Sequence, residues 1–107
     1  MKEELLYTIL REYKEGLRKI FGDSLEQVLL YGSYARAEAR DDSDVDVLCI
    51  INKPFKYGEL IRKTSELTSN ISLKYDVSIS RAFALSSDYR KLNLPFYINT
   101  RREAIAV

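Results

Sequence analysis

Two alternating aspartates open the most apolar stretch of the chain. Ser43-Asp44-Val45-Asp46 leads directly into Val47 to Ile51, a run without polar alternation. This pattern predicts a strand buried on both faces, on which Asp44 and Asp46 point to the same side. Their Cβ atoms would then lie about 6 to 7 Å apart, so each carboxylate raises the proton affinity of the other unless a cation lies between them. Because Mg²⁺ usually takes one or two protein carboxylates, the pair predicts a divalent metal site.

A glycine–serine pair precedes the acidic segment. Leu25 to Tyr31 predicts a strand, Gly32-Ser33 follows at once, and Tyr34 to Ala39 favours a short helix. Gly32 would let a phosphate approach the backbone, and Ser33 would cap the helix beside free N–H groups. Arg36 could add a guanidinium to the same phosphates. The segment is therefore predicted to bind an anion.

Together the two segments resemble a known signature. Gly32-Ser33-Tyr34-Ala35-Arg36 and Ser43-Asp44-Val45-Asp46 are similar to the GSxAR…SDxD pattern of the minimal nucleotidyltransferases (MNT) of the polymerase-β-like superfamily. The resemblance covers nearly the whole chain and implies an α/β (α+β) fold, a small mixed sheet with packed helices. One departure is Ala37, where the family commonly has a glycine; a tight turn is less favoured there.

The resemblance also implies roles for individual residues. Leu73 to Arg81 alternates with period two, which predicts a strand with Asp76, Ser78 and Ser80 on one face. A third family carboxylate falls at Asp76. The implied catalytic residues and ligands of two Mg²⁺ ions are Asp44, Asp46 and Asp76. The implied nucleotide-binding residues are Gly32, Ser33, Arg36 and Ser43.

The implied reaction is transfer of AMP from ATP to a hydroxyl, with release of pyrophosphate. Freestanding MNT proteins of this length look like the antitoxins of HEPN/MNT toxin–antitoxin pairs, in which AMP is attached to a tyrosine of the HEPN toxin. Two alternatives stay open. One is a non-catalytic module that neutralises its partner by contact, and the other is a small-molecule nucleotidyltransferase of the antibiotic-resistance type. Homo- or hetero-oligomers are compatible with all three.

Size and composition limit the number of domains, the kinds of ligand and the side chains available for catalysis. The 107 residues predict one domain, 1–107. Seventeen basic against sixteen acidic residues give a net charge of +1, which argues against direct binding of nucleic acid or an anionic membrane. The absence of histidine excludes His-dependent triads and His-ligated zinc, so carboxylates must carry the chemistry. The single cysteine, Cys49, is expected to be a buried core residue. With no signal peptide or membrane-spanning run, a cytoplasmic location is expected.

The remaining elements follow from hydrophobic periodicity. Lys2 to Phe21 is predicted to form an amphipathic helix, and a weaker stripe predicts a second helix over Tyr57 to Ser72. A helical turn is expected near Ser86, a further helix from Pro95, and a short strand over Ala104 to Val107.

Overall fold

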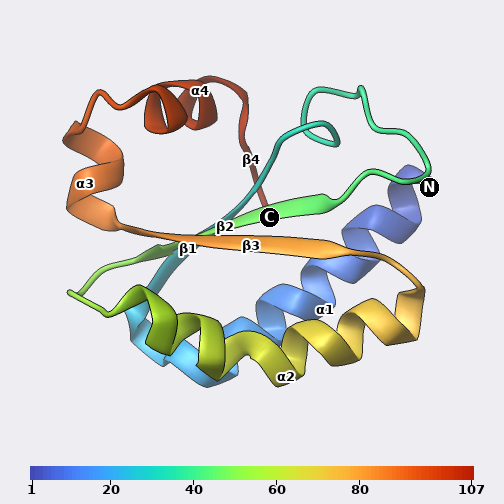
Figure 1. The fold of residues 1–107 in the computed structure, drawn as a ribbon, viewed down its shortest axis with the longest axis horizontal. Helices are drawn as coiled ribbons and strands as arrows, with labels where there is room; N and C mark the ends of the chain where they lie inside the picture. Colours follow the sequence, from blue (N-terminus) through green and yellow to red (C-terminus); the bar gives the residue numbers. More distant parts are fainter.

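The computed structural model describes all residues, 1–107, and contains one four-stranded sheet. Four α-helices and a short 3-10 turn connect and cover the strands (Figure 1). In chain order the elements are α1 (Glu3–Phe21), η1 (Gly22–Ser24), β1 (Leu25–Tyr31), β2 (Val45–Ile51), α2 (Tyr57–Tyr75), β3 (Ile79–Leu85), α3 (Ser86–Lys91), α4 (Pro95–Glu103) and β4 (Ile105–Ala106).

The sheet is mixed, with strand order β3-β2-β1-β4. β1 pairs antiparallel with both β2 and β4, whereas β2 and β3 run parallel. A parallel pair needs a long crossover, which α2 supplies. The predicted α+β fold with a mixed sheet is confirmed.

The two long helices cover one face of the sheet. α1 buries the stripe predicted from its spacing, including Leu6, Ile9, Tyr13 and Leu17. It lies beside α2 on the same side of the sheet (Figure 1). The strand residues that point toward them form the main core with these helices; on β2 they are Val45, Val47, Cys49 and Ile51. Cys49 is fully buried, as predicted. Neither of these 19-residue helices is apolar enough to span a membrane.

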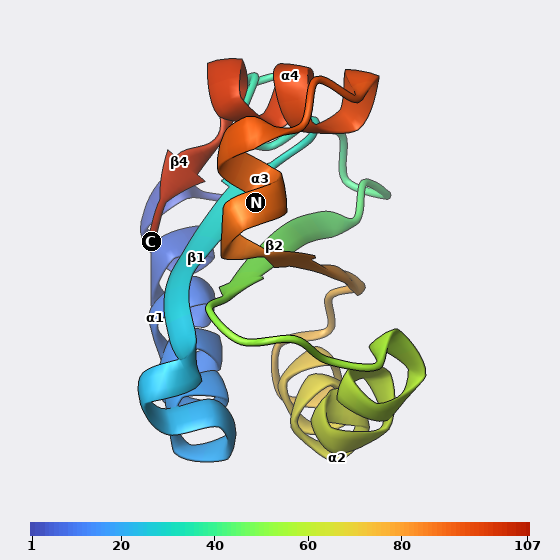
Figure 2. The ribbon, with the colours of Figure 1, turned by 90° about the vertical axis from the view of Figure 1, so that its left-hand side faces the viewer.

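The short helices lie on the opposite side of the sheet. Figure 2 shows α3 and α4 across the strands from α1 and α2. A smaller core beneath them contains Leu29, Leu48, Ile50 and Ala84. Because side chains alternate along a strand, Asp46 lies on the same face as Leu48 and Ile50. The candidate site therefore opens on the face that the short helices only partly cover.

The predicted strand over Leu73 to Arg81 is wrong in its bounds. α2 continues to Tyr75, and β3 begins at Ile79 and runs to Leu85. The alternation that suggested a strand spans the end of a helix and the connection after it. Parallel pairing with β2 sets the register of β3, with Val45 opposite Ile79 and Ile51 opposite Leu85. Apart from the short helix expected over 34–39, the other predicted elements lie within a few residues of those observed.

Candidate active site

A single tight turn connects β1 to the acidic segment. We call Gly32–Glu38 the motif turn. The Arg36 N–H donates to the Gly32 carbonyl at 3.1 Å, and the Glu38 N–H donates to the Ser33 carbonyl at 2.9 Å. The expected helix over 34–39 is therefore wrong, because the chain makes one turn and then extends. Ala37 has a φ of 58°, a left-handed conformation that ends the turn.

The start of this turn lies directly against Asp46. Gly32 has a φ of 76°, and a Cβ atom placed on it would overlap the Asp46 carboxylate, 3.0 Å from its Cγ. A side chain at position 32 would thus be strained and would displace Asp46. Gly32 is required here both by its backbone angle and by the space that it leaves to the carboxylate.

The structure brings Asp44 and Asp46 together. Asp44 immediately precedes β2, and Asp46 is its second residue. Burial raises the pKa of Asp46, and the nearby negative charge of Asp44 raises it further, whereas the positive charge of Arg36 lowers it. Asp46 is therefore a partly buried carboxylate beside a second one, which is an arrangement that a cation would stabilise.

A pair of carboxylates fits Mg²⁺ as an ion that shares its coordination sphere with water and substrate phosphates. The expected cluster of three carboxylates is not formed, because no group of three Asp, Glu, His or Cys side chains is arranged to hold a metal. Asp76 is the residue that lies elsewhere. It caps the C-terminus of α2 with φ 54° and ψ 51°, outside any strand.

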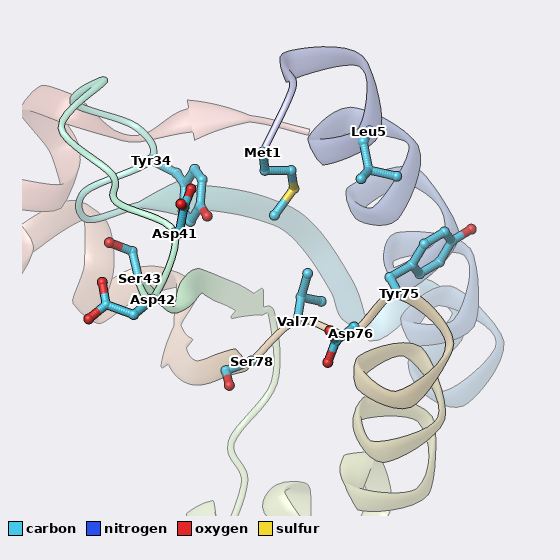
Figure 3. A pocket seen from close by; sticks show the side chains of 10 residues that line it. All are labelled: Met1, Leu5, Tyr34, Asp41, Asp42, Ser43, Tyr75, Asp76, Val77 and Ser78. Carbon is cyan, nitrogen blue, oxygen red and sulfur yellow. The ribbon is translucent and has the colours of Figure 1, made fainter.

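Asp76 faces a separate cavity of about 340 Å³. Figure 3 shows residues 41–43 on one side of this cavity and residues 76–78 on the other. Neither Asp44 nor Asp46 lines it. The complete lining is Met1, Leu5, Tyr34, Asp41, Asp42, Ser43, Tyr75, Asp76, Val77 and Ser78.

The predicted nucleotide-binding residues have different surroundings. The Ser43 hydroxyl accepts a hydrogen bond from the Arg40 N–H at 2.8 Å, and thus closes the turn before β2. Within the motif turn, the N–H groups of Ser33, Tyr34 and Ala35 donate to no backbone acceptor. Arg36 is held between two glutamates, with Nε 3.2 Å from Glu38 and Nη1 3.1 Å from Glu103.

Three neighbours of the site are not among the site residues predicted from the sequence. Tyr31 lies opposite Asp46 across the antiparallel pair, and burial followed by the charge of Asp46 raises the pKa of its hydroxyl to about 12. Ser80 lies opposite Asp46 on β3. Glu103 reaches Arg36 from α4, although 67 positions separate them. Strand register could have indicated Tyr31, but no local sequence signal indicates that Glu103 contacts Arg36.

The turn, the paired acids and the arginine meet at one end of the two central strands of a mixed sheet. Such an arrangement is typical of enzymes that act on phosphate esters. Residues 10–100 match the family model described as "Nucleotidyltransferase domain". The chain belongs to this nucleotidyltransferase family, as a minimal nucleotidyltransferase, and the family resemblance seen in the sequence is confirmed.

Relatives of similar length carry a more specific name. The protein adenylyltransferase MntA of Thermococcus cleftensis is 44% identical over 74 residues, which cover 69% of this chain and 73% of that protein. A predicted protein adenylyltransferase of Methanocaldococcus jannaschii is 40% identical over 72 residues, 67% of this chain and 72% of the relative.

Solved structures share the fold. One of a minimal nucleotidyltransferase superposes with a TM-score of 0.61 at 24% identity and covers 95% of both chains. One of a toxin–antitoxin with AMP-PNP gives a TM-score of 0.61 at 14% identity, covering 88% of this chain and 68% of that one.

Proposed function

We propose that this protein transfers AMP from ATP to a hydroxyl group of a partner protein, and that it acts as an antitoxin by doing so. The observation that carries the proposal is the contact between Gly32 and Asp46, which juxtaposes the motif turn and the paired carboxylates. The names of the adenylyltransferase relatives support the choice of AMP and of a protein acceptor.

In the proposed reaction, the acceptor oxygen attacks the α-phosphorus of ATP and the bond to the β-phosphate breaks. Pyrophosphate leaves, and the acceptor hydroxyl loses its proton. Asp44 and Asp46 would hold Mg²⁺, which neutralises phosphate charge and lowers the pKa of the acceptor hydroxyl. The sequence predicts two ions; the two carboxylates found together suit one ion completed by phosphate and water.

The motif turn would bind the phosphates beside this pair. Its N–H groups at Ser33, Tyr34 and Ala35 have no backbone acceptor and are available to phosphate oxygens. Arg36, in the same turn, would add a positive charge near Asp46, whose pKa it lowers. The Ser43 hydroxyl would act indirectly, by fixing the turn that precedes Asp44.

The proposed partner is a HEPN-domain toxin, modified on a tyrosine in the cytoplasm. Support comes from the toxin–antitoxin MntA–HpeT, whose solved mutant carries two aspartate-to-glutamate changes two positions apart and which shares this fold, with a TM-score of 0.60 at 12% identity. The spacing of those changes equals that of Asp44 and Asp46 here. The AMP-PNP bound in the other toxin–antitoxin supports ATP as the donor.

The test combines the protein, ATP, Mg²⁺ and the product of the neighbouring gene, the proposed HEPN toxin, followed by intact-mass spectrometry. We expect the wild type to add the mass of AMP to the partner and Asp46→Asn to add none. Asp42→Asn is the matched control, because it removes an acid from the adjacent loop without touching the pair, and it should keep the wild-type rate. Neutralisation of the toxin by Asp46→Asn without added mass would instead support inhibition by contact.

Asp76 remains a predicted catalytic residue whose position differs from the expected one. Asp76→Asn separates its charge from its backbone role, because asparagine tolerates the left-handed conformation well. If Asp76 contributes a carboxylate to the reaction, the variant should keep its melting temperature and lose transfer activity. Wild-type activity would restrict the essential acids to Asp44 and Asp46.

A further inference from the structure

We propose that Glu103 is a positioning residue, which holds the Arg36 guanidinium in the orientation that binds nucleotide phosphates. This inference rests on the proposed function and concerns the same site. It assigns a role in substrate binding to the last residue of α4, an element that contributes no carboxylate to the acidic pair.

The two carboxylates around Arg36 are not equivalent. Glu103 Oε1 lies 3.1 Å from Nη1, and its side chain is 27% exposed. Glu38 Oε2 lies 3.2 Å from Nε, and its side chain is 64% exposed. The more exposed glutamate comes from the motif turn itself and moves with it. Glu103 is the partner that fixes Arg36 relative to another part of the molecule.

α4 is anchored firmly enough to serve as that reference. Its Phe96 ring packs edge-on against Tyr31 with centroids 5.4 Å apart, and Tyr31 is the last residue before Gly32. Thr100 is 2% exposed and faces the interior. Arg101 donates hydrogen bonds to the carbonyls of Tyr89 and Leu92, which tie α4 to the end of α3. The Glu103 carboxylate is thus presented from a helix held against β1 and α3.

Arg36 keeps free N–H donors for a substrate phosphate while it is paired with both glutamates. A guanidinium has five N–H donors in one plane, and the two glutamates engage only Nε and Nη1. Nη2 has no protein acceptor. Arg36 belongs to the motif turn, whose first residue, Gly32, lies directly against the Asp46 carboxylate, so the guanidinium is carried by the segment next to the acidic pair. Pre-orienting a long side chain lowers the conformational entropy lost when a phosphate binds.

The test compares Glu103→Gln with Glu38→Gln. We would measure AMP-PNP binding with Mg²⁺ by calorimetry, and KM and kcat for AMP transfer to the partner. Glu103→Gln should weaken nucleotide binding about three- to tenfold and raise KM for ATP, with kcat nearly unchanged. Glu38→Gln should change affinity less. Both variants should melt near the wild-type temperature, since each removes only an exposed or partly exposed ion pair.

An Arg36→Ala background supplies the decisive control. If Glu103 acts through Arg36, Glu103→Gln should cause no further loss of affinity there. Tighter binding by Glu103→Gln, or an equal loss with and without Arg36, would overturn the proposal. A wild type that binds no nucleotide would overturn the proposed function itself. Normal binding by wild type and Glu103→Gln, but not by Asp46→Asn, would overturn only the role of Glu103.

Discussion

Ala37 occupies a backbone position that suits glycine better than alanine. Its φ of 58° falls in the left-handed region, where a Cβ approaches the following carbonyl. The sequence identified this position as a departure from the family pattern, and the structure explains the family's preference for glycine. Asp76 is the other non-glycine residue with positive φ, and its short polar side chain makes that conformation easier to adopt.

Replacing Ala37 should therefore stabilise the protein. We expect Ala37→Gly to raise the free energy of unfolding by about 0.5 to 1 kcal/mol, because relief of the left-handed strain exceeds the added entropy of the unfolded chain. Ala39→Gly is the matched control: residue 39 has no positive φ, so the change should be neutral or destabilising. Urea titration of both variants measures the difference. A loss of stability in Ala37→Gly would contradict the strain that we assign to it.

The raised pKa of Asp46 gives stability a defined dependence on pH. In the folded protein the carboxyl holds its proton to a higher pH than its ordinary value of 3.8. The unfolded chain therefore ionises first as pH rises, and folding stability falls through that interval. Asp46→Asn removes this effect, so at pH 7 it should be at least as stable as the wild type. The difference should close as pH falls below about 4.

Binding of Mg²⁺ to the acidic pair can be tested through the melting temperature. If the ion binds the acidic pair, it should raise the melting temperature of the wild type by mass action and leave that of Asp46→Asn unchanged. Asp42→Asn should respond like the wild type, since Asp42 lies in the loop that precedes the pair. An equal response in all three proteins would place the ion elsewhere.

At the level of elements, periodicity located most helices and strands but not the end of α2. The stripe on α1 and the apolar run of β2 are long and unambiguous. The segment from Leu73 to Arg81 alternates by chance, and Tyr75 still packs against the main core from the last turn of the helix. The β3 sequence includes two alanines, Ala82 and Ala84, which give little strand signal. Pairing with β2 determines where β3 begins and ends, and local sequence does not show this pairing.

The candidate site likewise combines features that local sequence predicts with features that depend on tertiary packing. The proximity of Gly32, Asp44 and Asp46 could be predicted because these residues lie beside two predicted strands, so local spacing determines their neighbours. Asp76 was misplaced because its expected position depended on the wrong strand. The contact between Glu103 and Arg36 could not be predicted, since it depends on how α4 docks onto the sheet.

α1 and α2 are joined by a buried polar contact that can be tested. The Tyr13 hydroxyl lies 2.7 Å from Thr68 Oγ1. The Thr68 hydroxyl donates its own hydrogen bond to the Thr64 carbonyl. Tyr13→Phe removes one hydrogen bond and leaves Thr68 satisfied, so it should lower stability by about 1 kcal/mol. Tyr7→Phe is the control, because the Tyr7 hydroxyl makes no hydrogen bond within the protein. Equal melting of both variants would show that the contact contributes nothing.

The charge of the whole molecule favours a protein or nucleotide ligand over a polyanion. Seventeen basic and sixteen acidic residues nearly cancel, so few counterions could be released on binding to a duplex. We expect no measurable binding to a random DNA or RNA duplex at about 150 mM salt. Fluorescence anisotropy with a labelled duplex tests this, with a basic DNA-binding protein as the positive control. Micromolar affinity at this salt would contradict the expectation.

The sheet separates a thick layer of two long helices from a thin layer of two short ones (Figure 2). Most of the buried apolar side chains belong to the thick layer, whereas Asp46 belongs to the thin one. We therefore expect substitutions of exposed residues on the thin side to alter chemistry or partner choice with little loss of folding stability. Such exposed positions could vary in evolution without compensating mutations in the interior.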